Sequence, residues 1–271
     1  MSRRHFTFEC DGAKLCGTLD PAPAATGLLI VTGGNELRSG PWGSQAELAV
    51  RIAATGFPVL RFDRRGVGDS EGENSGFTTS AQDIAAALVA FRAHLPRLKR
   101  VVAYGNCDAA SALMLAGGEG CDALVLANPW TYEPELTIEA QPESGLEPVA
   151  MPPSAVRAHY LRRLTSPGAI WRLLTGKVEL GKLASSLVDA VKPDAPPSTL
   201  AQQMAAGIAG FDRPVTILLA ERDRTAQAFL ANWNKSDGRI RQCPEASHSF
   251  VEPQARIWLQ GQLLAALRGA G

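Results

Sequence analysis

The decisive stretch of this sequence is Tyr104-Gly105-Asn106-Cys107-Asp108-Ala109-Ala110. It follows an apolar run typical of a buried strand and opens an alanine-rich segment typical of a helix. A sharp strand-to-helix turn that carries a nucleophile at its apex has the pattern G-x-S-x-G. Small residues two places before and after the apex are a steric requirement of such a turn, and Gly105 and Ala109 meet it. The pattern therefore predicts Cys107 as the nucleophile.

Cysteine is chemically suited to this apex. A thiol at a helix N-terminus and near a histidine has a pKa below the free value of about 8.5, and its thiolate attacks a carbonyl carbon without full general-base help. Two other interpretations stay open at this point. Cys107 could be a small buried apolar side chain at a strand end. A frame shift could also place Asp108 at the apex, although Asn106 would then stand where a small residue is needed.

Strand-like and helix-like segments alternate along the rest of the chain. The apolar runs typical of buried parallel strands are 28–31, 58–62, 100–104, 123–127, 215–219 and 240–243. Helical spacing marks the segments 46–54, 81–95, 109–115 and 253–267. The first residues have the pattern of a hairpin that turns at Asp11-Gly12. This alternation predicts an α/β protein with a mostly parallel central sheet and helices on both faces.

The composition excludes several classes of function. The 271 residues include 27 Lys plus Arg and 27 Asp plus Glu, so the net charge is zero and gives no electrostatic case for nucleic-acid binding. The five cysteines show no zinc-ligand spacing, and we expect no metal and no cofactor. No stretch approaches the roughly 18 apolar residues of a membrane span, and no signal-peptide pattern is found. We expect a reduced, cytoplasmic protein, and its oligomeric state stays open.

A carboxylate and a histidine complete the predicted site in the order nucleophile, acid, histidine. His248 follows the last expected strand, whereas the other histidines lie at positions that suit this role less well. Asp223 follows the run 215–219, where a carboxylate would accept the histidine N–H and fix its tautomer. Glu221 is the alternative acid, and either carboxylate could instead be a solvated loop charge.

Two backbone N–H groups are expected to form an oxyanion hole, which stabilises the negative charge of an acyl-transfer intermediate. The loop Thr32-Gly33-Gly34 follows the first core strand and would supply the N–H of Gly34. The residue after the nucleophile, Asp108, would supply the other. The alternative for this loop is an ordinary glycine turn. A second loop, 63–70, has glycines for a tight turn and charges expected to connect loops rather than to bind phosphate.

The strand–helix alternation stops between residues 131 and 212. Residues 133–153 contain five Glu and five Pro and no Lys or Arg, whereas 157–182 carry six basic residues and one acidic residue. We expect a helical cap or lid, 131–212, inserted into a core formed by 1–130 and 213–271. An anionic partner such as an acyl carrier could bind the basic part, although charge runs usually form only a solvated face. The arginines in question are Arg157, Arg162, Arg163 and Arg172.

These features together resemble the α/β-hydrolase superfamily. The motifs that carry the resemblance, in family order, are Thr32-Gly33-Gly34, Asp63-x-Arg65-Gly66-x-Gly68-x-Ser70, Gly105-x-Cys107-x-Ala109, Asp223 and His248. The second motif is similar to that of the serine aminopeptidase-like (hydrolase 4) branch. More narrowly, segments 30–34, 56–63, 107–111, 128–130 and 159–161 resemble the exosortase A system-associated hydrolase 1 family. The resemblance implies the α/β-hydrolase fold. Members of the narrower family sit in bacterial loci for exopolysaccharide and protein sorting, so the resemblance also implies a bacterial housekeeping or surface-polymer role.

The function expected from these residues is hydrolysis of an ester or thioester through a Cys107–His248–Asp223 triad and an acyl-cysteine intermediate. Cysteine departs from the commoner serine of the family, as it does in the similar dienelactone hydrolases and polyester synthases, and this departure favours activated acyl groups. The substrate would be a small-molecule or carrier-linked acyl compound. Two alternatives remain: an acyltransferase that uses the same triad, and a non-catalytic binding protein that has kept the fold.

Overall fold

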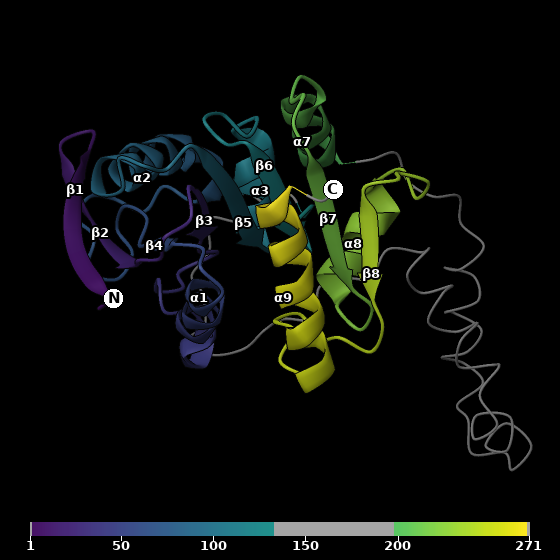
Figure 1. Ribbon diagram of the computed structural model, residues 1–271. Helices are drawn as coiled ribbons and strands as arrows, with labels where there is room; N and C mark the ends of the chain where they lie inside the picture. Colours follow the sequence, from purple (N-terminus) through teal and green to yellow (C-terminus); the bar gives the residue numbers. More distant parts are fainter. Residues whose placement is uncertain (1, 133–197, 270–271) are drawn as a thin grey trace, which may run out of the picture.

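The six apolar runs and the N-terminal hairpin form an eight-stranded sheet in the computed structural model, which describes residues 2–132 and 198–269 (Figure 1). The strands are β1 (Arg4–Cys10), β2 (Ala13–Asp20), β3 (Thr26–Val31), β4 (Val59–Phe62), β5 (Arg100–Asn106), β6 (Ala123–Ala127), β7 (Val215–Ala220) and β8 (Ile240–Cys243). The α-helices are α1 (Ser44–Ala54), α2 (Ala81–His94), α3 (Asp108–Leu115), α7 (Thr199–Ala209), α8 (Arg224–Asn232) and α9 (Pro253–Arg268). Two short 3-10 helices are η1 (Pro41–Gly43) and η2 (Phe77–Thr79).

The sheet has the strand order β1-β2-β4-β3-β5-β6-β7-β8. The hairpin β1–β2 is antiparallel and joins the sheet antiparallel to β4, whereas every other neighbouring pair is parallel. Parallel neighbours require crossover connections, and helices supply them. The predicted α/β class with a mostly parallel sheet is therefore confirmed, including the N-terminal hairpin.

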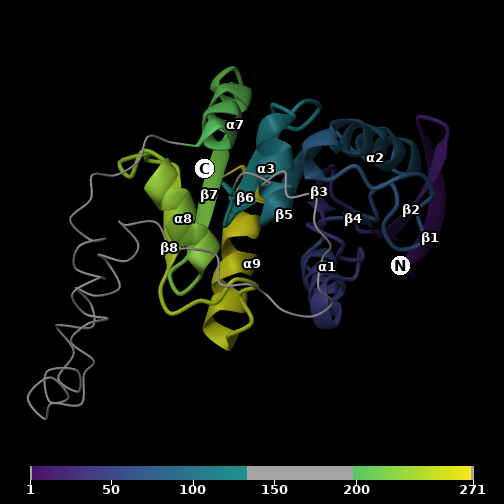
Figure 2. The same ribbon diagram turned by 180° about the vertical axis from the view of Figure 1, so that it is seen from behind.

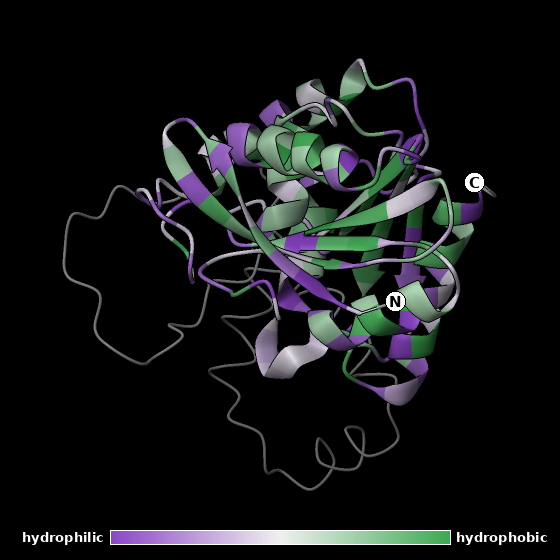
Figure 3. Ribbon diagram, turned by 60° about the vertical axis from the view of Figure 1, so that its left-hand side comes forward, coloured by the Kyte–Doolittle hydropathy of each residue, from purple (hydrophilic) through white to green (hydrophobic). Residues whose placement is uncertain are grey.

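Helices cover both faces of this sheet, as views from opposite sides show (Figures 1 and 2). Apolar side chains of α1 and α9 pack on one face, and those of α2, α3, α7 and α8 pack on the other. The central strands β3 and β6 are buried along nearly their whole length, whereas β1 at the edge alternates exposed and partly buried residues (Figure 3 colours the strands by hydropathy). Strands buried on both faces need continuous apolar runs, which explains why the sequence showed runs rather than alternation. None of the helices described is long and apolar enough to cross a bilayer.

Helix α7 belongs to the apolar layer beside α3, although its residues fall within the predicted insertion 131–212. The two helices approach closely at Gly207, where an added Cβ would lie 2.2 Å from the carbonyl oxygen of Met114. Only glycine permits this approach. The acidic and basic stretches between residues 133 and 197 lie outside the described residues, and so do the four arginines considered for an anionic partner. The division into core and cap stays a prediction.

The carboxyl edge of the sheet gathers the residues singled out in the sequence. Strand β5 ends one residue before Cys107, β7 ends three residues before Asp223, and β8 ends five residues before His248. Because these strands are parallel, their carboxyl ends meet at one edge, which is where open α/β sheets bind ligands.

Candidate active site

Cys107 stands at a strained turn between β5 and α3. Its backbone angles are φ 62° and ψ −129°, a region that residues other than glycine avoid. Such strain costs about 1–3 kcal/mol and persists only where the surrounding structure enforces it. An added Cβ at Gly105 would lie 2.7 Å from the backbone carbon of Ala109, so only glycine fits there. The turn therefore has the geometry that the sequence predicted for a nucleophile at its apex.

Asp223 and His248 are joined by a hydrogen bond in which His248 Nδ1 donates to Asp223 Oδ2 at 2.9 Å. The same carboxylate caps α8, because it accepts the backbone N–H groups of Thr225 and Ala226 at 3.2 and 3.1 Å. Asp223 is only 7% exposed. The interpretation of Asp223 as a solvated loop charge is therefore wrong. Glu221 lies elsewhere, with its carboxylate accepting the backbone N–H of Glu245.

The imidazole of His248 is held in a setting that favours its protonated form. Burial alone would lower the pKa of His248, but hydrogen bonds and charge interactions with Asp223 and Cys107 outweigh burial and raise it to about 10. Since Nδ1 donates to Asp223, the other ring nitrogen is the one available to the thiol of Cys107. The structure thus brings Cys107, His248 and Asp223 together from three loops at the carboxyl edge.

Two asparagine side chains hold the backbone of the histidine loop, and we call Asn106 and Asn128 the amide clamp. Asn128 Nδ2 donates to the carbonyl oxygen of His248 at 2.9 Å, and Asn106 Nδ2 donates to the same oxygen at 3.3 Å. Asn128 also donates to Asn106 Oδ1 at 3.0 Å and accepts the backbone N–H of Ala220 at 2.8 Å. Asn128 is fully buried and has a positive φ of 42°, which asparagine tolerates better than most residues. The clamp links the ends of β5, β6 and β7 to the backbone of His248.

The predicted oxyanion donor Gly34 already has a hydrogen-bond partner. Its N–H donates to both carboxylate oxygens of Asp108, at 2.7 Å each. The carboxylate fits against the loop so closely that an added Cβ on Gly33 would lie 2.3 Å from Asp108 Oδ1. Buried Arg64 lies nearby, with Nη2 3.7 Å from Asp108 Oδ2 and 2.5 Å from the carbonyl oxygen of Gly34. The loop 63–70 therefore supports the site structurally, as the sequence predicted for its charges.

A cavity of about 370 Å³ opens in front of Cys107. It is lined by Gly33, Gly34, Glu36, Phe77, Asn106, Cys107, Asp108, Trp130 and His248. Phe77 and Trp130 give it an apolar wall, whereas Glu36 adds a carboxyl whose pKa is raised by burial and by the charge of Asp108, against the opposing effect of His248. Residues 2–132 and 198–269 contain no group of three or more His, Cys, Asp or Glu side chains that could hold a metal ion.

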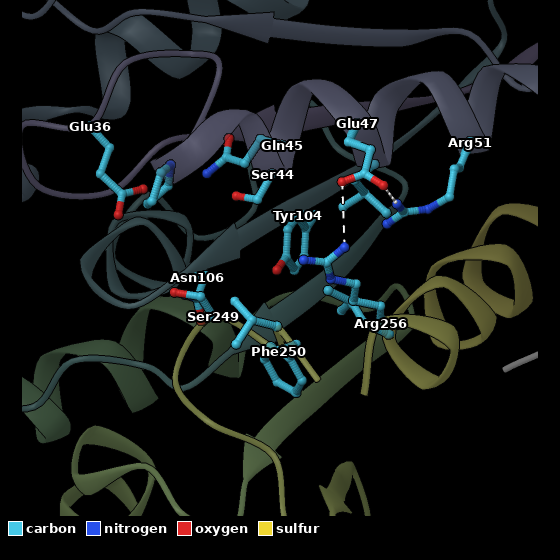
Figure 4. A pocket seen from close by; sticks show the side chains of 14 residues that line it. Glu36, Ser44, Gln45, Glu47, Arg51, Tyr104, Asn106, Ser249, Phe250 and Arg256 are labelled. Atoms are coloured by element: carbon cyan, nitrogen blue, oxygen red, sulfur yellow. Dashed lines mark hydrogen bonds and ion pairs between the residues drawn. The ribbon is translucent and has the colours of Figure 1, made fainter. Parts of the chain in front are cut away.

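A second, smaller cavity of about 50 Å³ lies beside the first and shares Glu36 and Asn106 with it. Figure 4 shows the side chains of Tyr104 and of the C-terminal segment facing those of α1 across this space. Glu47 closes its outer side with ion pairs to Arg51 at 2.7 Å and to Arg256 at 3.6 Å (Figure 4). Its size accommodates no more than a few water molecules.

Several residues of the site were not predicted from the sequence. The amide clamp, Glu36 and the aromatic residues Phe77 and Trp130 were assigned no role, and Asp108 was expected to act only through its backbone N–H. Glu36 and Asn106 lie within two residues of the predicted site residues Gly34 and Cys107, and this proximity is the feature of the sequence that could have placed them in the site. Asn128 directly follows β6, a position from which a polar side chain can reach the carboxyl edge.

Residues 28–257 match the Alpha/beta hydrolase family. The chain belongs to that family. In this α/β hydrolase Cys107, Asp223 and His248 follow the strands β5, β7 and β8 in that order along the chain. No curated protein matches the chain at a significant level.

Solved structures that are similar to this α/β hydrolase share its fold at low sequence identity. The Pyrococcus furiosus esterase Pf2001 is 13% identical with a TM-score of 0.60, over 98% of this chain and 90% of that one. Est1E from Butyrivibrio proteoclasticus, solved with bound ferulic acid, is 16% identical with a TM-score of 0.59, over 97% and 99%. The thioesterase domain from the curacin biosynthetic pathway is 14% identical with a TM-score of 0.52, over 99% and 100%. These similarities establish the fold.

Proposed function

We propose that this α/β hydrolase cleaves an ester or thioester through an acyl-cysteine intermediate on Cys107. The observation that carries the proposal is the arrangement of Cys107 at a strained apex beside an imidazole that is itself fixed by Asp223 at 2.9 Å. Nucleophile, base and orienting carboxylate in this arrangement form the triad of acyl-transfer enzymes. All three side chains come from the carboxyl edge, and Cys107 and His248 line the same cavity.

The chemistry follows from these positions. The sulfur of Cys107 attacks the acyl carbonyl carbon, and His248 takes up the proton of the thiol in the same step. A C–S bond forms, the bond from the acyl carbon to the leaving oxygen or sulfur breaks, and His248 returns the proton to the leaving group. Water, deprotonated by His248, then attacks the acyl-cysteine, which releases the carboxylic acid and restores the thiol. Asp223 holds the imidazole in the required tautomer throughout.

Two backbone N–H groups are the proposed oxyanion donors, those of Asp108 and Gly34. The N–H of Asp108 opens α3, where the helix dipole also favours negative charge. The N–H of Gly34 is engaged by the Asp108 carboxylate, so it becomes available only when that carboxylate moves.

An acyl substrate of modest size suits the cavity. Its volume of about 370 Å³ and its aromatic wall would hold an acyl chain or a small aromatic acid. An esterase and a thioesterase domain are among the proteins of similar structure, which supports the same substrate classes. A small-molecule or carrier-linked acyl compound is the proposed substrate, and membership of the exosortase A system-associated hydrolase 1 family is part of this proposal.

Steady-state hydrolysis of a matched short-chain ester and thioester tests the proposal. Cys107→Ala should lower kcat/KM for every substrate that the protein hydrolyses by about 10³-fold or more, since it removes the nucleophile. Cys121→Ala is the matched control, because Cys121 is buried just before the amino end of β6, away from the carboxyl edge, and its loss should leave activity unchanged. Hydrolysis that survives in Cys107→Ala, or its absence from the wild-type protein across the panel, would favour a different function.

A further inference from the structure

The carboxylate of Asp108 occupies the position of a bound anion. Both of its oxygens lie 2.7 Å from the backbone nitrogen of Gly34, which is the geometry expected for an oxyanion in that place. The Asp108 side chain is only 14% exposed and closely packed against Gly33. The side chain of the residue after Cys107 therefore competes with any substrate oxygen for one of the two proposed donors.

This competition should lower the rate of the reaction. Removing one oxyanion donor from an acyl-transfer enzyme lowers the rate by about 10²–10³-fold. Here the donor is present but engaged, and the occupying group is itself negatively charged, so a second negative oxygen beside it is electrostatically unfavourable. The rate should fall most for substrates whose reaction depends strongly on oxyanion stabilisation, such as simple alkyl esters. Thioesters depend on it less, because their carbonyl carbon is more electrophilic and a thiolate leaves readily.

Arg64 keeps the carboxylate in this place and offers it a second partner. The guanidinium is 3% exposed, it donates from Nη1 to Ser80 at 2.8 Å and from Nη2 to the carbonyl oxygen of Gly34 at 2.5 Å, and Nη2 lies 3.7 Å from Asp108 Oδ2. Its Nε is buried without a hydrogen-bond partner among the described residues. The buried guanidinium thus places a positive charge 3.7 Å from the Asp108 carboxylate, on the side of the carbonyl group of Gly34.

We propose that Asp108 determines the substrate specificity of this site: its carboxylate engages the N–H of Gly34, and the enzyme therefore selects thioesters and other activated acyl groups over simple oxygen esters. The inference rests on the proposed acyl-cysteine function and narrows its substrate class. Asp108 acts on the reaction in two ways, through its backbone N–H as a donor and through its side chain as the competitor for Gly34. Only the side-chain effect is removed by substitution.

The test compares two substrates that differ in one atom, the butyryl thioester of N-acetylcysteamine and the corresponding oxygen ester of N-acetylethanolamine. Acylation rates are measured for the wild-type protein, Asp108→Ser and Asp108→Asn, with thermal melting to verify folding. Asp108→Ser removes the carboxylate that accepts the Gly34 N–H. Asp108→Asn keeps an amide oxygen that can accept this N–H but removes the negative charge. Glu119→Ser, an exposed site outside the cavity, is the control for the loss of one negative charge.

The wild-type protein should react with the thioester and only slowly with the oxygen ester. Asp108→Ser should raise the rate with the oxygen ester by about 10-fold to 10²-fold more than the rate with the thioester. The ratio of thioester to ester rates for Asp108→Asn should lie between those of the wild-type protein and Asp108→Ser. A ratio of thioester to ester rates that is the same in wild type and in both variants would overturn the inference while leaving the acyl-cysteine mechanism intact. A wild-type protein and variants that all fail to react with either substrate would overturn the proposed function itself.

Discussion

The side-chain amide of Asn128 donates a 2.9 Å hydrogen bond to the backbone carbonyl of His248, a residue 120 positions further along the chain. Asn128 holds the backbone of His248 and Asp223 holds its ring, so both the main chain and the imidazole of the histidine are restrained. Asn106, which precedes the proposed nucleophile, donates to the same oxygen at 3.3 Å. The amide clamp thus ties the placement of the proposed base to the turn that carries the proposed nucleophile.

Asn128→Asp should lower kcat by about 10-fold to 10²-fold with a smaller change in KM. The carboxylate can still accept the N–H of Ala220 but cannot donate to His248, so the loop should shift by enough to misplace the imidazole. Asn232→Asp in α8 is the matched amide-to-carboxylate control, and it should leave kcat unchanged. Asn128 would have a purely structural role if both variants lost kcat equally, or if the loss of kcat were fully explained by a lower melting temperature.

Asp223→Asn should lower kcat/KM by about 10²-fold or more while the protein stays folded. An amide at this position favours the tautomer of His248 in which Nδ1 is unprotonated, and serine enzymes with this change lose about 10⁴-fold. Glu221→Gln serves as the comparison and should retain activity, because the Glu221 carboxylate accepts the backbone N–H of Glu245, whereas the imidazole N–H goes to Asp223. An inactive Glu221→Gln beside a fully active Asp223→Asn would reverse the assignment of the acid.

Limited alkylation with iodoacetamide at neutral pH should modify Cys107 first. Burial raises the pKa of each of the other four thiols, to about 11 for Cys10 and about 12 for Cys121, so little thiolate is present on them. Cys107 by contrast lies beside an imidazole whose pKa is raised to about 10. Peptide mapping after partial reaction gives the order of modification, and His248→Asn should slow the labelling of Cys107. Preferential labelling of any other cysteine would contradict this expectation.

The raised pKa of His248 also predicts a pH dependence of stability. A histidine whose folded-state pKa of about 10 exceeds its unfolded value of about 6.5 contributes stability that is fully present below about pH 6.5. That contribution declines as pH rises and is lost once pH passes about 10. Urea unfolding of the wild-type protein and of His248→Asn should therefore show a difference in free energy that shrinks between about pH 6.5 and 10. A difference independent of pH across that range would mean that His248 is not held in its protonated form.

The sheet could be predicted from the sequence because its strands are buried on both faces and stand out as short apolar runs. The runs 123–127 and 240–243 match β6 and β8 to the residue. The turn at Cys107 was predictable for a similar reason, since its geometry depends on small residues at Gly105 and Ala109, close by in the chain. Helix α8 was not predicted, because its start depends on the cap that Asp223 provides, and the sequence showed only a charged run there.

Contacts between segments far apart in the chain could not be predicted from such local patterns. The hydrogen bond from Gly34 to the side chain of Asp108 joins residues 74 positions apart, and the clamp on His248 joins three strand ends. Each depends on side-chain direction after folding, which no periodicity encodes. The close packing of α7 on α3 at Gly207 is of the same kind, because a glycine within a helix gives no indication of what approaches it.

The most direct test of the acyl-cysteine mechanism is the mass of the protein during turnover. The wild-type chain is mixed with a short-chain thioester, quenched in acid within milliseconds to seconds, and examined by intact mass and peptide mapping. The mechanism predicts a single acyl group per chain on the peptide that contains Cys107, its absence from Cys107→Ala, and its decay at the rate of product release. Acylation of a different residue, or product formation with no acyl group on Cys107 at any time, would contradict it.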